Sequence, residues 1–214
     1  MKLLTKMSHV PGILLLVSTS LAAGEWTPLF NGKDTSGWKV EGEAKAEVVD
    51  GVLVGSQKSP KGGNFFTEAE YDNFELRFTY KVDWPANSGV WFRFDGKGYQ
   101  YDILKYKNPV AFSGSLYCPG KVFITRNLNE GLENRDGWNK GQVYANGDHL
   151  ILWLNGTKVG ECRDDTLEKG SIGIQVHGGD GFTKMAIHIK KMEIRTLGPN
   201  DQPTPPAAKN IPAG

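Results

Sequence analysis

The chain has few of the features that mark common catalytic or nucleic-acid-binding classes. Only two of its 214 residues are cysteines, and its formal net charge is +1. A nearly neutral chain is a poor partner for a polyanion, because nucleic-acid binding usually shows as a basic excess or stripe. The sequence also has no Ser-His-Asp motif, no phosphate-binding glycine loop and no CxxC pair. We therefore expect no nucleic-acid partner and no serine-hydrolase, nucleotide-binding or dithiol chemistry.

Two further patterns are missing. The sequence has no E-x-D-x-x-E carboxylate cluster, so ordinary retaining glycoside hydrolysis by two close carboxylates has no support. No segment shows a long apolar period of 3.6 residues, which excludes a mainly helical fold. What remains is period-two alternation, with 27 glycines and 11% aromatic residues to supply tight turns and packed strands. These features predict an all-β domain, a two-sheet antiparallel jelly-roll sandwich over residues 25–198.

The two ends of the chain are predicted to lie outside this domain. Lys2 and Lys6 precede a short apolar run, and small residues follow it. This is the pattern of a signal peptide over residues 1–24, cleaved near Ala22 to Gly24, although an uncleaved anchor is the alternative. The prediction is a secreted or periplasmic protein with no membrane attachment after cleavage. Residues 199–214 are rich in proline and are expected to be disordered.

Cys118 and Cys162 both lie in the part of the chain that would be exported. In an oxidising compartment two such thiols can pair. The sequence does not show whether their Cα atoms approach closely enough, so a disulfide and two free thiols both stay open. No motif around either residue indicates a catalytic thiol.

The stretch 87–106, NSGVWFRFDGKGYQYDILKY, predicts a central hairpin with a turn at 95–98. Val90, Phe92 and Phe94 would face the core, and Trp91 and Arg93 would face away from it. A tryptophan, an arginine and a carboxylate on one sheet surface indicate a polar groove for a ligand. Residues 107–139 are less regular, and such a long segment is uncommon in a compact domain unless it is functional. We expected Tyr117 and Trp138 from this segment to overhang the groove.

Strand parity places further polar residues opposite the aliphatic positions of separate strands. Those assigned to the same face as the groove are Glu75, Arg77, Arg93, Gln100, Asp102, Gln175 and His177. Each has a structural alternative. Arg93 could pair with Asp102 across strands, Glu75 and Arg77 could belong to a solvated strip, and His177 could only close a strand.

Several of these segments resemble a known family in their order along the chain. They include LFNGKDTSGW (29–38), YDNFELRFTYKV (71–82), NSGVWFR (87–93), GYQYDIL (98–104) and GSIGIQVHGG (170–179). Together they resemble the 3-keto-disaccharide hydrolase domain family, over about residues 25–197. The resemblance implies a concanavalin A-like, laminarinase-like jelly roll and a mostly bacterial, exported group acting on 3-oxidised glycosides. One strand departs from the family pattern G-Y-E-x-Q-I-x-D, with Gln100, Asp102 and Lys105 in place of its Glu, Gln and Asp.

The resemblance implies a specific chemistry. A ketone at C3 of a sugar acidifies the C2 proton, so a base can remove that proton while the C1 substituent leaves, and water can then add to complete hydrolysis. We assigned His177 or Asp102 as the base, and Arg93 as the group that steadies the developing oxyanion.

The remaining assignments concern the ligand and cofactors. The residues expected to contact the carbohydrate are Glu75, Arg77, Trp91, Gln100, Lys105, Tyr117, Trp138 and Gln175. No cofactor is required by the sequence, and a divalent metal held by Asp102, His177 and Glu75 is an alternative. The alternative functions are a non-catalytic, lectin-like carbohydrate-binding module, since one fold can host both, and a structural subunit of a cell-surface assembly.

Overall fold

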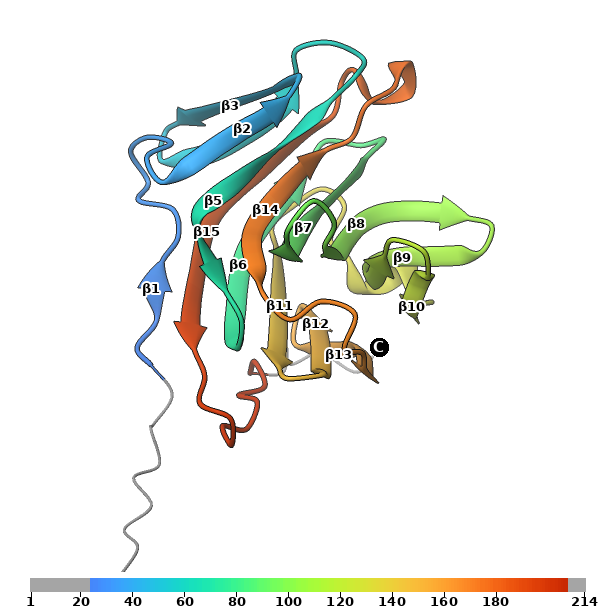
Figure 1. Ribbon diagram of the computed structural model, residues 1–214. Coiled ribbons are helices and arrows are strands. Elements are labelled where there is room, and N and C mark those ends of the chain that lie inside the picture. Colours follow the sequence, from blue (N-terminus) through green and yellow to red (C-terminus); the bar gives the residue numbers. More distant parts are fainter. Residues whose placement is uncertain (1–23, 208–214) are drawn as a thin grey trace, which may run out of the picture.

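The computed structural model describes residues 24–207, which form two antiparallel β-sheets packed face to face (Figure 1). Within these residues the only helical elements are two 3₁₀ turns, η1 (Glu130–Leu132) and η2 (Asp180–Phe182). The predicted two-sheet sandwich is therefore confirmed. The predicted signal peptide lies outside the described residues, apart from Gly24. No helix in the described part of the chain is long and apolar enough to span a membrane.

The larger sheet, which we call sheet A, has eight strands in the order β13-β12-β11-β6-β15-β4-β3, with β1 paired to β15. Its strands are β1 (Thr27–Pro28), β3 (Ala44–Val49), β4 (Val52–Gln57), β6 (Phe74–Val82), β11 (Asn139–Asn146), β12 (His149–Leu154), β13 (Thr157–Arg163) and β15 (Ala186–Thr196).

The second sheet, sheet B, has seven strands in the order β10-β9-β8-β7-β14-β5-β2. Its strands are β2 (Trp38–Gly42), β5 (Gly63–Tyr71), β7 (Asn87–Phe94), β8 (Tyr99–Lys107), β9 (Val110–Cys118), β10 (Val122–Asn127) and β14 (Gly170–Val176). The predicted central hairpin is β7 and β8, and it lies in the middle of this sheet (Figure 1).

Tight turns fix the pairing of neighbouring strands. Asp50 and Gly51, between β3 and β4, have φ of 49° and 77°, and Asn155 and Gly156, between β12 and β13, have φ of 50° and 88°. Two consecutive positive φ angles match the twist of an antiparallel pair, and Asp, Asn and Gly tolerate them best.

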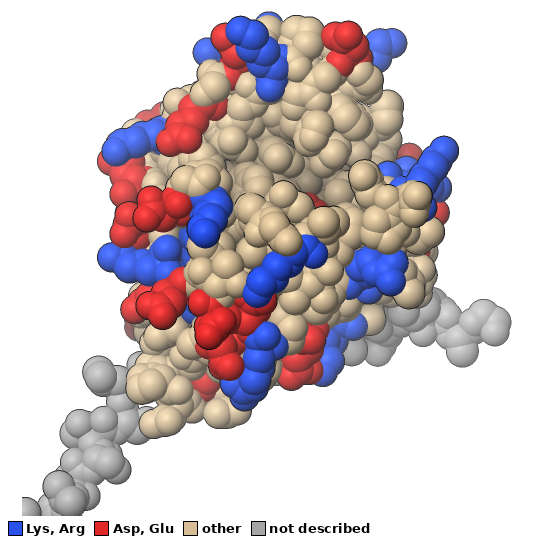
Figure 2. Space-filling model, turned by 45° about the vertical axis from the view of Figure 1, so that its right-hand side comes forward, with Lys and Arg blue, Asp and Glu red and all other residues tan. Residues whose placement is uncertain are grey.

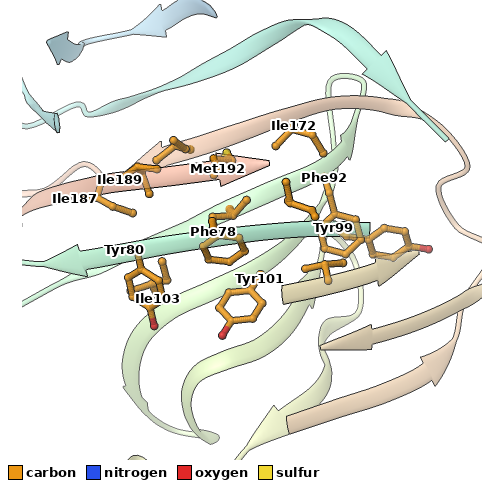
Figure 3. Close-up of a cluster of buried hydrophobic side chains, with 14 of the residues drawn as sticks. Phe78, Tyr80, Phe92, Tyr99, Tyr101, Ile103, Ile172, Ile187, Ile189 and Met192 are labelled. Atoms are coloured by element: carbon orange, nitrogen blue, oxygen red, sulfur yellow. The ribbon is translucent and has the colours of Figure 1, made fainter. Parts of the chain in front are cut away.

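A single core fills the space between the sheets. Sheet A contributes side chains such as Phe78 and Tyr80 from β6, and sheet B contributes Phe92, Tyr99 and Tyr101 (Figure 3). Phe78 and Tyr101 meet edge to face with ring centroids 5.1 Å apart, an arrangement that aromatic pairs favour. Period-two alternation in β6 and β8 puts the aromatic residues inward and leaves the other positions for the outer faces.

Two sequence expectations change in the described structure. Residues 107–139 are not an irregular overhang, because β9 and β10 occupy 110–118 and 122–127 and extend sheet B. The segment 199–207, which we expected to be disordered, lies against the outer face of sheet A. The Tyr144 hydroxyl donates to the Asp201 carbonyl at 2.8 Å, and the Thr204 N–H donates to Glu75 at 2.6 Å. Residues 208–214 lie outside the described part.

The two cysteines are free thiols in this structure. Cys118 is buried and Cys162 is partly buried. Desolvation raises the pKa of Cys162 to about 11, so neither its position nor its ionisation indicates a reactive thiolate.

Candidate functional site

A pocket of about 260 Å³ lies on the outer face of sheet B, opposite the core. Eleven residues line it: Asn87, Trp91, Gln100, Asp102, Leu104, Tyr106, Tyr117, Val122, Phe123, Gln175 and His177. We call this hollow the central pocket. None of its lining residues is a lysine or arginine. In the view of Figure 2, charged side chains surround a broad area of surface that has few of them.

Strand register explains why these side chains converge. Gln175 on β14, Gly89 on β7 and Asp102 on β8 lie directly opposite one another across three strands. One row further along the strands, Trp91 lies opposite Gln100. Side chains that share a face of neighbouring strands come within reach of one another. These four side chains therefore lie together on one face, as the sequence predicted.

The glycine at the centre of the first row creates the space. A side chain at Gly89 would place its Cβ within 2.6 Å of the Gln100 side chain. Gln100 can therefore fold over β7 between Gln175 and Asp102 only because position 89 carries no side chain.

Asp102 is the least ordinary group in the central pocket. It is only 3% exposed, and its Oδ2 has no hydrogen-bond partner among the described residues. Desolvation raises the pKa of this carboxyl well above its usual range, because burial disfavours the charged form and no neighbouring cation offsets it. This environment favours the protonated form of the carboxyl, which can donate a proton.

Gln100 carries a second unpaired polar atom on the same face. It is 4% exposed, and its Nε2 has no acceptor within residues 24–207. A buried polar group without a partner costs free energy, so two of them side by side point to a ligand with polar groups of its own. An amide N–H beside a carboxyl suits a ligand oxygen such as a hydroxyl or a ketone.

His177 lies at the end of β14, on the rim of the central pocket. Its Nδ1 is 2.5 Å from the Gly178 carbonyl oxygen. A carbonyl oxygen can only accept, so Nδ1 carries the proton and Nε2 of the neutral ring has a free lone pair. Phe182 packs edge to face on the imidazole with centroids 5.2 Å apart. The orientation of the ring is thus fixed, and Nε2 can act as a base.

Aromatic side chains form the opposite end of the central pocket. Trp91 is 6.2 Å from Tyr117 and 5.6 Å from Phe94 between ring centroids. The indole N–H of Trp91 donates to Asn64 Oδ1 at 2.9 Å, which holds the ring in place. Aromatic surfaces of this kind provide apolar contact area for the faces of a ligand ring.

Arg93 does not lie in this pocket, and the prediction that it shares a face with Asp102 is wrong. The register between β7 and β14 shifts at this point, so that Arg93 is an extra residue with φ of 50°. Such a bulge reverses the alternation that follows it. Phe94 consequently lies beside Trp91 rather than in the core.

The Arg93 side chain instead ties together three loops at one end of the sandwich. It is 1% exposed. Its guanidinium donates to the carbonyl oxygens of Asp72 at 2.8 Å, Gly147 at 2.8 Å and Leu167 at 3.0 Å. These bonds give Arg93 a structural environment, and its assignment to a developing oxyanion in the pocket has no geometric basis.

Glu75 and Arg77 were also assigned to the wrong surface, because β6 belongs to sheet A. Their side chains lie on the outer face of that sheet. Glu75 is paired with Arg195, with Nε 2.7 Å from Oε2, and Arg77 is paired with Glu193 at 2.6 Å. Alternation correctly predicted which residues of β6 avoid the core, but not which sheet contains the strand.

Two other predicted contact residues lie outside the central pocket. Lys105 is exposed and pairs with Glu130 at 2.7 Å. Trp138 is also exposed, and Lys190 of sheet A lies over its ring at 5.7 Å. The structure therefore brings together six of the predicted site residues, which are Trp91, Gln100, Asp102, Tyr117, Gln175 and His177.

The sequence analysis missed several lining residues. Asn87 was not among the predicted site residues, although it begins β7 and lies opposite Leu104. Tyr106 and Phe123 meet edge to face at 5.8 Å, but Phe123 belongs to the segment that was expected to be irregular. The alternation in 122–127 is short, and it gave too weak a signal to predict a strand.

The metal hypothesis does not fit the described residues. Asp102 and His177 line the central pocket, but the third predicted ligand, Glu75, lies on the other sheet. Across residues 24–207 no three His, Cys, Asp or Glu side chains are grouped so that they could hold a metal ion.

The chain matches a known domain family over most of its length. Residues 25–195 match the model of the family described as the 3-keto-alpha-glucoside-1,2-lyase-like domain. None of the curated proteins matches the sequence.

Solved structures show the same fold at low sequence identity. A candidate glycosyl hydrolase from Parabacteroides distasonis is 24% identical, with a TM-score of 0.63 over 81% of this chain and 100% of that one. A protein from Bacillus subtilis described as having a galectin-like fold is 14% identical, with a TM-score of 0.65 over 84% and 99%. The carbohydrate-binding module CBM66 from Bacillus subtilis is 16% identical, with a TM-score of 0.53 over 77% and 99%. All three are β-sandwich neighbours of this chain.

Proposed function

Since the chain belongs to the 3-keto-alpha-glucoside-1,2-lyase-like domain family, we propose that it cleaves the glycosidic bond of 3-keto-glycosides in the central pocket. The observation that carries this proposal is the juxtaposition of a buried, unpaired Asp102 carboxyl with the oriented imidazole of His177. The two groups differ in environment, and their roles follow from that difference.

His177 acts as the base in this proposal. Its Nε2 takes the proton from C2 of the sugar, which the neighbouring C3 ketone has made acidic. The electron pair of the C2–H bond forms a C1–C2 double bond, and the C1–O bond to the leaving group breaks. Gln100 Nε2 donates a hydrogen bond to the ketone oxygen as negative charge develops there. Gln100 thus replaces Arg93 in the role that the sequence analysis had assigned.

Asp102 acts as the acid. Burial raises the pKa of its carboxyl well above the usual range, which favours the protonated form, so the proton can pass to the leaving oxygen as the C1–O bond breaks. The products are a free alcohol and a 1,2-unsaturated 3-keto sugar. Addition of water to that double bond would complete a net hydrolysis, so the same residues serve a lyase or a hydrolase.

Substitution of the two groups tests this assignment directly. His177→Gln and Asp102→Asn should each lower kcat toward a 3-keto-glucoside by about 100-fold or more, the usual contribution of a positioned acid or base. His149→Gln is the matched control, because His149 lies on sheet A and pairs with Glu161 at 2.9 Å. If both pocket variants keep the wild-type rate, the proposed roles are excluded. NMR detection of the unsaturated sugar would separate elimination from hydrolysis.

A second candidate function is carbohydrate binding without turnover. The observation that favours it is the absence of lysine and arginine from the lining of the central pocket, because an enolate is usually stabilised by a cation or strong donors. The pocket also has the aromatic end and paired amides of a sugar-binding surface. Calorimetry with glycosides and their 3-keto derivatives, combined with product analysis, distinguishes the two functions. Saturable binding with no product supports the binding module.

Export of the protein also stays a proposal. It rests on the basic, apolar and small-residue pattern of residues 1–24. The mass of the mature protein after expression in a bacterial host tests it, because cleavage near Ala22 to Gly24 would remove this segment.

A further inference from the structure

A second and larger hollow opens beside the central pocket. It has a volume of about 670 Å³ and shares Asn87, Leu104, Tyr106 and His177 with the central pocket. We call it the lateral pocket. Its remaining lining includes Trp84, Lys105, Lys107, Arg135 and Phe182. Because His177 lines both hollows, a ligand whose sugar lies in the central pocket can extend past the imidazole into the lateral one.

The two pockets differ in the polar atoms they leave unpaired. The central pocket offers a donor on Gln100 and a carboxyl on Asp102. The lateral pocket is lined by two residues with buried, unpaired N–H donors, Trp84 Nε1 and Arg135 Nε, whereas no buried side-chain acceptor there lacks a partner among the described residues. Two buried donors are satisfied by a group that accepts, such as a carboxylate.

Charge supports the same conclusion. Three cations line the lateral pocket, and no carboxylate does. Glu130, just outside it, pairs with Lys105 at 2.7 Å and with Arg135 at 2.9 Å. Lys107 makes no ion pair with any described residue. Glu133 also interacts electrostatically with Arg135, so two carboxylates are set against three cations and the lining keeps a positive excess.

The walls of the lateral pocket are largely apolar and partly aromatic. The Arg135 guanidinium carbon lies over the Trp84 ring, 4.1 Å from its centroid, a cation–π contact that helps to position the guanidinium. Tyr106 is 46% exposed, so its ring is available to a ligand. A flat apolar group fits such walls better than a second sugar, which carries several hydroxyls that need both donors and acceptors.

We infer that the lateral pocket binds the leaving group of the substrate, and that it prefers an aromatic aglycone carrying a carboxylate. This inference rests on the proposed function, because it takes the central pocket as the site of the oxidised sugar. The carboxylate accepts hydrogen bonds from Arg135 and Trp84 and is attracted to Lys107, while the ring packs on Tyr106. The aglycone oxygen then lies next to the groups that cleave its bond to C1.

Binding of the aglycone alone tests this inference independently of turnover. The probes are 4-hydroxybenzoate and its neutral counterpart 4-hydroxybenzamide, titrated into the full chain and followed by NMR. We expect the acid to bind about 5- to 10-fold more tightly than the amide, and the ratio to shrink with added salt because the extra attraction is charge-assisted.

Three variants assign that preference to the lateral pocket. Lys107→Gln and Arg135→Gln should each reduce the acid-to-amide ratio to below about twofold, since each removes a charged donor. Trp84→Phe should reduce the affinity for the acid about threefold, because it removes one hydrogen bond and keeps the ring. Lys140→Gln is the matched control, since Lys140 is an exposed residue on β11 of sheet A, and it should keep the wild-type ratio.

The outcomes separate this inference from the proposed function. Equal affinity for acid and amide, or a ratio that neither Lys107→Gln nor Arg135→Gln changes, overturns the inference even if 3-keto-glucosides are cleaved. Conversely, an acid preference that depends on Lys107 supports the lateral pocket even if no turnover is found. If 3-keto-disaccharides are cleaved with a higher kcat/KM than the 3-keto-glucoside of 4-hydroxybenzoate, the leaving-group preference is also wrong.

Discussion

Each sheet of this sandwich buries a carboxyl group on its outer face, but only one of the two groups has partners for its charge and hydrogen bonds. Glu75 on sheet A is 0% exposed, but it is paired with Arg195 and accepts the Thr204 N–H. Asp102 on sheet B is 3% exposed and has an oxygen with no partner. Burial therefore does not distinguish a functional carboxyl from a structural one in this molecule.

The two carboxyl groups differ in whether other groups of the protein offset the free-energy cost of their burial. A buried carboxylate that is paired and hydrogen-bonded contributes to a defined structure, and its removal leaves a partner charge behind. A buried carboxyl without a partner costs stability, and such groups are concentrated at sites where a ligand supplies the missing contacts. On sheet A the segment 199–207 covers the Glu75 carboxylate and donates to it from Thr204, whereas Asp102 on sheet B lines an open pocket.

The largest expected effect is on sheet A. Glu75→Ala should lower the free energy of unfolding by about 3–5 kcal/mol, because Arg195 would be left largely buried without its partner. Urea denaturation followed by tryptophan fluorescence measures this change. The kcat/KM of the folded variant should stay at the wild-type value, since Glu75 is not in the central pocket.

A surface pair provides the control for this substitution. Glu47 is exposed and pairs with Lys45 at 2.8 Å, so Glu47→Ala should cost less than about 1 kcal/mol. A loss of under 1 kcal/mol for Glu75→Ala as well would show that the paired carboxylate on sheet A contributes no more than a surface ion pair.

A somewhat smaller loss is expected at Arg93. Arg93→Met should lower the free energy of unfolding by about 2–3 kcal/mol, because three carbonyl oxygens lose a charged donor. Arg126→Met is the control, since Arg126 is exposed and makes a single 3.2 Å bond to the Val110 carbonyl. A large fall in kcat/KM for Arg93→Met, with the fold intact, would contradict the placement of Arg93 outside the site.

Arg93 also shows where prediction from sequence stops. Alternation in residues 74–82 and 99–104 correctly separated core positions from outer positions, because the side-chain period of a strand is fixed by backbone geometry. A bulge adds one residue and reverses that parity. The sequence VWFRF at residues 90–94 contains no feature that predicts the bulge. The bulge is visible only from the pairing of β7 with β14, a contact between residues about 80 positions apart.

Glu75 marks a second limit of a different kind. Parity tells which residues of a strand avoid the core, but a sandwich has two outer faces, and the sequence does not say to which one a strand belongs. Six predicted residues converged because β7, β8, β9 and β14 are all in sheet B. The resemblance to a known family supplied the fold, while the site required the order of strands in each sheet.

The smallest expected effect has the opposite sign to the others. Asp102→Asn should raise the free energy of unfolding by about 1–2 kcal/mol at pH 7, because it replaces a group that is costly to ionise in this pocket by a neutral one of the same shape. For a chain of this size the melting temperature should rise by roughly 2–6 °C. A gain in stability together with a loss of turnover is what the substitution of a functional carboxyl predicts.

The pH dependence of this gain tests the cause. The pKa of Asp102 is raised in the folded protein, whereas an unfolded Asp titrates near its ordinary value of about 3.9. Above that pH the folded state binds more protons than the unfolded state, so wild-type stability falls as the pH rises toward the folded pKa. The advantage of Asp102→Asn should therefore be nearly absent below about pH 4 and grow as the pH rises from there toward the folded pKa. Asp95→Asn, in the exposed β7–β8 turn, should show no such trend. A stability gain of Asp102→Asn that is constant with pH would mean that the gain comes from packing. The difference between Asp102 and Glu75 could then not be attributed to desolvation of an unpaired carboxyl.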